Sequence, residues 1–115
     1  MVEELSPAEV HERLDDEELT IVDIRPPDEY RHGHVPGAIN VPMTEFARRV
    51  EEIEWGEEVV MVCPIGQSSL QAARLLGSYE GVEADAVKSM AGGYDAWEYE
   101  LEGDEPAVAD EEAPF

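Results

Sequence analysis

The sequence predicts an α/β fold in which an open, mainly parallel sheet is flanked by helices on both faces. Segments with strand and helix patterns alternate along the chain, as is typical of such folds. The uninterrupted apolar run Val-Val-Met-Val at residues 59–62 indicates a strand that is buried on both sides. With 115 residues, the chain is long enough to form one domain with its own core.

The N-terminal half begins with a helix signal. Ser6, Pro7 and Glu9 stand at the N-cap, first and third positions of a helix that should continue to about Leu14. We expect Pro26 to end the strand that follows this helix. The predicted elements after the first helix are a strand at 19–24, a helical turn at 28–31, a short strand at 39–41 and a helix at 43–52.

The C-terminal half continues the alternation. After the buried strand at 59–62, an apolar stripe predicts a helix at 67–78. We then expect a strand at 82–87, a loop at 89–92 and a closing helix at 93–101. Residues 102–115 carry six acidic residues, two prolines and no basic residue, which predicts a flexible acidic tail after a domain at 1–101.

Cys63, the single cysteine, directly follows the buried strand and precedes a glycine-containing loop and a helix. In an open α/β sheet, ligands bind beyond the carboxyl ends of the strands. Backbone N–H groups and the helix N-terminus stabilise a thiolate at such a junction. A small buried core residue is the commoner role of a lone cysteine, but the Gly and two Ser that follow argue against it here.

The loop after Cys63 can surround a negatively charged sulfur with donors. Pro64 has no N–H to offer, whereas Gly66 readily takes the positive φ of a tight turn. We therefore predict Cys63 as the nucleophile. The predicted N–H cradle consists of Ile65, Gly66, Gln67, Ser68 and Ser69.

Three separate segments together resemble the rhodanese family. The first is D-x-R at residues 23–25, with E-Y at 29–30 and G-H-x-P-G-A-x-N-x-P at 33–42. The others are C-x-x-G at 63–66, with the helix after it, and G-G-x-x-A-W at 92–97. The likeness covers about residues 5–101. It implies a rhodanese-like fold and a sulfurtransferase cycle. In that cycle Cys63 takes sulfane sulfur from a donor such as thiosulfate and passes it to an acceptor.

The resemblance also gives roles to Asp23 and Arg25, which it places at the end of a strand near the active-site loop. Arg25 could attract an anionic donor, with Asp23 as its support. The alternative is an ion pair that ties the strand end to neighbouring loops, and we favour this structural interpretation. We likewise interpret His34 as part of a structural turn whose ring bonds to backbone. Tyr94 and Trp97 are expected to be packing residues.

Ser68 departs from the family's usual loop, which has Arg at this position. Some single-domain thiosulfate sulfurtransferases resemble the serine form, so the change leaves the donor open rather than excluding activity. A phosphatase or arsenate reductase of the related loop type would need Arg where Ser69 stands. A thiol redox protein would need a second cysteine or an external reductant. The main alternative is a non-catalytic binding or sulfur-carrier module.

The charge limits the partners: 29 acidic against 7 basic residues give a formal net charge of −22. Such a chain repels nucleic acid and anionic membranes. The composition resembles that of proteins from extreme halophiles, and we expect salt to stabilise it by screening the acidic residues. We expect no metal and no cofactor. The predicted partners are a small sulfur-donor anion or a protein persulfide, and a thiol or cyanide acceptor.

One cysteine excludes an internal disulfide and fits a reducing compartment. Residues 1–4 show no secretory-signal pattern, and no apolar run approaches 18 residues. We therefore expect a cytoplasmic protein with no membrane span.

Overall fold

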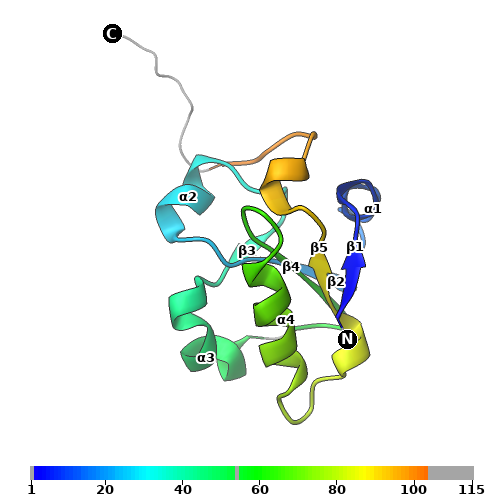
Figure 1. The fold of residues 1–115 in the computed structure, drawn as a ribbon, viewed down its shortest axis with the longest axis vertical. Coiled ribbons are helices and arrows are strands. Elements are labelled where there is room, and N and C mark those ends of the chain that lie inside the picture. The colour runs from blue at the N-terminus through cyan, green and yellow to red at the C-terminus, as the bar shows by residue number, and fades with distance from the viewer. Residues whose placement is uncertain (1, 54, 104–115) are drawn as a thin grey trace, which may run out of the picture.

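The computed structural model describes residues 2–53 and 55–103, and this part of the chain forms one parallel sheet. The strand order is β1-β5-β4-β2-β3, and every neighbouring pair is parallel. The predicted α/β fold is thus confirmed (Figure 1). The strands are β1 (Glu3–Leu5), β2 (Leu19–Asp23), β3 (Ile39–Asn40), β4 (Glu58–Val62) and β5 (Val87–Met90).

The helices are short. Ser6 caps α1 with the predicted capping box, since Glu9 N–H donates to the Ser6 hydroxyl and Ser6 N–H donates to the Glu9 carboxylate. The α-helices are α1 (Pro7–Glu12), α2 (Pro27–His32), α3 (Phe46–Arg49) and α4 (Ser68–Gly77). Single 3-10 turns occupy Met43–Glu45, Val50–Glu52, Ala84–Ala86 and Gly93–Ala96.

The sheet is covered on both faces, as its apolar central strand predicts. Alternate residues of β4 enter two separate cores. Val59 and Met61 pack with α3 and α4, whereas Val60 and Val62 pack with α1 and the segments at 35–38 and 94–97. Figure 1 shows α4 crossing one face of the sheet. The cores therefore hold β4 rigidly from both sides.

Because all strands run the same way, their carboxyl ends lie along one edge of the sheet. β2 ends at Asp23, β4 leads into Cys63, and β5 leads into the turn at Gly92. Segments that are 40 residues apart in sequence are thereby brought together. The candidate site lies at this edge.

An ionic cluster stabilises the opposite edge, where β4 begins. Arg13 donates to both Glu58 and Asp16, at 2.6 and 2.8 Å. Lys88 also contacts Glu58. The hydrogen bond from Arg13, helped by Lys88, lowers the pKa of Glu58 to about 2.

Two expectations were wrong in detail, and one strand was not predicted. The strand predicted at 82–87 lies at 87–90, because the ladder pairs Val59 with Val87 and Met61 with Ser89. The closing helix predicted at 93–101 is a single 3-10 turn, because Trp97 has extended backbone and Glu102 bridges to His34. β1 was missed because its Glu3 and Glu4 are exposed and leave no apolar alternation.

The predicted acidic tail lies outside the described residues from 104 onward. Glu102, at its predicted start, exchanges two backbone hydrogen bonds with His34, each 2.8 Å long. In the two described stretches of the chain, the helices are too short or too polar to cross a membrane.

Candidate active site

Cys63 lies between the end of β4 and the start of α4, as the sequence predicts, and its side chain is completely buried. Its sulfur accepts hydrogen bonds from Gly66 N–H at 3.0 Å and Ser69 N–H at 3.2 Å. The Ser69 hydroxyl oxygen also lies 3.2 Å from the sulfur. The thiol can donate to this oxygen, and the same hydroxyl can donate to an ionised sulfur. The surroundings thus suit a thiolate.

The five predicted cradle residues divide into two groups. Gly66 and Ser69 are buried and contact the sulfur. Ile65, Gln67 and Ser68 are exposed, and Ile65 keeps 57% of its surface accessible. These three exposed residues therefore form the part of the loop that an incoming molecule would contact first.

The turn after β5 packs directly against the Cys63 loop. Tyr94 N–H donates to the Cys63 carbonyl and Asp95 N–H to the Pro64 carbonyl, both at 2.9 Å. Gly93 makes this approach possible, because a Cβ at this position would lie 2.1 Å from the Cys63 carbonyl oxygen. Its φ of +60° also favours glycine. Gly93 of the G-G-x-x-A-W motif therefore lets this turn pack against the Cys63 backbone.

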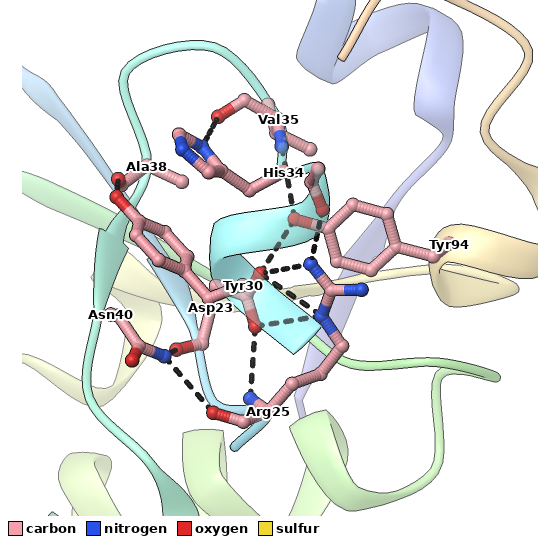
Figure 2. A network of polar contacts seen from close by, with 9 residues as sticks. Asp23, Arg25, Tyr30, His34, Val35, Ala38, Asn40 and Tyr94 are labelled. Atoms are coloured by element: carbon pink, nitrogen blue, oxygen red, sulfur yellow. Dashed lines mark hydrogen bonds and ion pairs between the residues drawn. The ribbon is translucent and has the colours of Figure 1, made fainter. Parts of the chain in front are cut away.

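Asp23 and Arg25 form the centre of a buried network (Figure 2). The fully buried Asp23 carboxylate accepts from Arg25 Nη2 at 2.7 Å and from the Tyr94 hydroxyl at 2.8 Å. Arg25 Nη2 also donates to the Gly33 carbonyl at 2.6 Å. Its guanidinium carbon lies 3.7 Å from the centroid of the Tyr94 ring. These contacts match the structural interpretation of the pair.

Tyr94 was expected only as a packing residue, yet it links three segments. Besides donating to Asp23, its hydroxyl accepts from Val35 N–H at 2.9 Å. Burial, followed by the negative charge of Asp23, raises the pKa of Tyr94 and so favours the protonated phenol that donates to Asp23. The sequence contains no signal for this role, because the partners are 59 and 71 residues away.

His34 has the expected structural role. Its ring is buried, its Nδ1 lies 2.9 Å from the Val35 carbonyl oxygen, and it stacks on Tyr30 with centroids 3.9 Å apart. Within the described residues, no group of three His, Cys, Asp or Glu side chains is arranged to hold a metal ion.

Ser89 is a polar residue of the site that the sequence analysis missed. It is fully buried on β5, and its hydroxyl lies 2.7 Å from that of Ser69. Correct placement of β5 would have revealed it, because Ser89 shares a sheet face with Val87, which packs in the same core as Cys63.

Comparison with known proteins identifies the family of this chain. The chain matches the Rhodanese-like domain family over residues 6–100. It therefore belongs to the rhodanese-like family.

Two relatives differ in their named roles. The thiosulfate sulfurtransferase GlpE of Pseudoalteromonas translucida (strain TAC 125) is 39% identical over 94 residues, which cover 82% of this chain and 87% of the relative. YrkF of Bacillus subtilis (strain 168), named as a candidate sulfur carrier protein, is 36% identical over 61 residues. That match covers 53% of this chain and 33% of the relative.

A solved structure shows the same fold. The rhodanese-like domain protein from Staphylococcus aureus superposes with a TM-score of 0.76 and 24% identity. The match covers 90% of this chain and all of that one.

Proposed function

We propose that the protein is a rhodanese-type sulfurtransferase in which Cys63 is the nucleophile. The observation that carries this proposal is the environment of the single cysteine. Two N–H groups and one hydroxyl surround its sulfur at 3.0 to 3.2 Å. Membership of the rhodanese-like family and the likeness to GlpE support it.

The proposed reaction proceeds in two displacements at sulfur. The Cys63 thiolate attacks the outer sulfur of a donor such as thiosulfate, the donor's S–S bond breaks, and sulfite leaves with the bonding electron pair. An acceptor thiolate or cyanide then attacks the terminal sulfur of the Cys63 persulfide. This second step releases a new persulfide or thiocyanate and regenerates the thiolate, so no net oxidation is needed and no cofactor is required.

The loop would serve this cycle through its hydrogen-bond donors. Gly66 N–H and Ser69 N–H stabilise the thiolate before attack. The exposed segment formed by Ile65, Gln67 and Ser68 would meet the donor and the terminal sulfur. Asp23 and Arg25 would act by fixing the surrounding loops. With one thiol in the chain and no internal partner for it, we place the reaction in the cytoplasm.

A second candidate function is a protein sulfur carrier. Two observations favour it over a small-anion enzyme. The loop has Ser68 at the position where the family's usual Arg would bind an anionic donor. The formal charge of −22 also repels a dianion such as thiosulfate. The likeness to YrkF points the same way.

A comparison of donors separates the two functions. Purified protein is supplied with thiosulfate, 3-mercaptopyruvate or a protein persulfide, with cyanide as acceptor, and thiocyanate is measured. Multiple turnover with a small donor supports the enzyme. Loading from the protein persulfide alone supports the carrier, and transfer from none of the donors would overturn the proposal.

A further inference from the structure

The hydroxyls of Ser69 and Ser89 form a chain that ends at the Cys63 sulfur. The Ser89 and Ser69 oxygens are 2.7 Å apart, and the Ser69 oxygen lies 3.2 Å from the sulfur. All three residues are fully buried. Among the described residues, no ionisable side chain other than Cys63 belongs to this series of hydrogen bonds, so their direction depends on the thiol and hydroxyl hydrogens alone.

Counting these hydrogens shows which direction is favoured. In one arrangement the thiol donates to Ser69, Ser69 donates to Ser89, and the Ser89 hydrogen has no acceptor. Within the described residues, Ser69 is the one hydrogen-bond partner of the Ser89 hydroxyl. A buried hydroxyl without an acceptor is costly, at about 1 to 3 kcal/mol.

In the opposite arrangement, with the Cys63 thiol ionised, every remaining hydrogen has an acceptor. Ser89 donates to Ser69, and Ser69 donates to the sulfur. The sulfur then receives three hydrogen bonds, because Gly66 N–H and Ser69 N–H already point to it. Three donors suit an ionised sulfur, which accepts strongly and has no hydrogen to place.

We propose that Ser89 is a positioning residue that directs the Ser69 hydroxyl hydrogen toward the Cys63 sulfur and so maintains its nucleophilic form. Its importance for sulfur transfer rests on the proposed function, but its effect on the thiolate does not.

The position of Ser89 in the sheet makes the arrangement rigid. Ser89 pairs with Glu4 of β1 on one side and with Met61 of β4 on the other. β5 therefore lies inside the sheet, between two strands. A hydroxyl on such a strand keeps a fixed distance from the first turn of α4, where Ser69 lies.

A double-mutant cycle tests this proposal without any sulfur donor. The variants are Ser89→Ala, Ser69→Ala and the double variant, with Ser78→Ala as the control. Ser78 has an exposed hydroxyl that donates to the Leu75 carbonyl at the far end of α4. The readouts at pH 7 are the rate of iodoacetamide alkylation and the thiolate absorbance lost on alkylation.

We expect Ser89→Ala to lower the alkylation rate and the thiolate absorbance by up to about tenfold, as follows from a shift of about 1.4 kcal/mol in the ionisation equilibrium. Ser69→Ala should lower both at least as much, and the double variant should match Ser69→Ala, because Ser89 acts through Ser69. Ser78→Ala should behave as wild type. Ser89→Gly provides a second variant without the hydroxyl, and melting curves identify folded protein.

Unchanged alkylation and absorbance in folded Ser89→Ala and Ser89→Gly would overturn the proposal. The proposal would also be overturned if the fold-changes of the two single variants multiplied in the double variant, since Ser89 would then act independently of Ser69. A protein that accepts no sulfur from any donor still gives these readouts, so failure of the proposed function is recognised separately.

Discussion

Gly93→Ala should be among the most damaging single-methyl changes, because Gly93 packs against the backbone of the Cys63 loop. Its φ of +60° costs an alanine about 1 to 2 kcal/mol. The new Cβ would also lie 2.1 Å from the Cys63 carbonyl oxygen and 2.7 Å from Gly66 N, so backbone must move. Two backbone hydrogen bonds, from Tyr94 and Asp95, are then lost at about 1 kcal/mol each.

The total predicted cost is about 3 to 4 kcal/mol. Gly81→Ala is the matched control, because Gly81 has a φ of +89° but nothing within 4 Å of the position that an added methyl group would take. It should cost only the conformational part, about 1 to 2 kcal/mol. Urea unfolding followed by circular dichroism measures both. Equal destabilisation by the two substitutions would refute the claim that the turn positions the Cys63 loop.

Three further predictions concern other contacts. Tyr94→Phe leaves the Val35 N–H without its acceptor, so we expect a loss of about 1 to 3 kcal/mol in urea unfolding; an unchanged midpoint would contradict the network. The pKa of Glu58 is about 2 in the folded state, against an ordinary value of 4.5. The ionised Glu58 carboxylate therefore stabilises the folded state fully above about pH 4.5, and this stabilisation is lost as the pH falls toward 2. The difference in melting temperature between wild type and Glu58→Gln should therefore shrink over this range, and a constant difference would show that the charge of Glu58 does not stabilise the fold. Ser68→Arg should lower the KM for thiosulfate by an amount worth about 1 to 2 kcal/mol, because the guanidinium would bind the anion. An unchanged KM would show that the loop has no room for a guanidinium.

The sequence was sufficient to predict an α/β fold with a buried central strand, and the position of Cys63, because both depend on local patterns. The apolar run at 59–62 identifies a doubly buried strand, and the carboxyl end of such a strand is where an α/β fold places its ligands. The helix at 67–78 was also evident from its apolar stripe. Together these elements place the thiol beside the first turn of α4.

The position of β5 could not be predicted in the same way. The local alternation at 82–87 resembles a strand, but the parallel ladder with β4 and β1 selects residues 87–90. Burial of Ser89 follows from this register. The role proposed for Ser89 therefore depends on pairing between segments about 30 and 85 residues apart along the chain, which no local pattern encodes.

The roles of Tyr94 and Gly93 are also products of the tertiary structure. Glycine is common in turns of many kinds. Only the packing of this turn on the Cys63 loop shows why no side chain fits at Gly93. Likewise, the D-x-R motif alone left Arg25 with two possible roles, and the contacts with Tyr94 and Gly33 are what favour the structural one.

Intact-mass measurement tests most directly whether Cys63 carries the transferred sulfur. After incubation with a competent donor, the wild-type chain should gain the mass of one sulfur atom, which cyanide or a thiol then removes. Cys63→Ser should gain none, although Ser is nearly isosteric and the fold should remain intact. Sulfur transfer by folded Cys63→Ser protein, or no adduct on the wild type with any donor, would contradict the account.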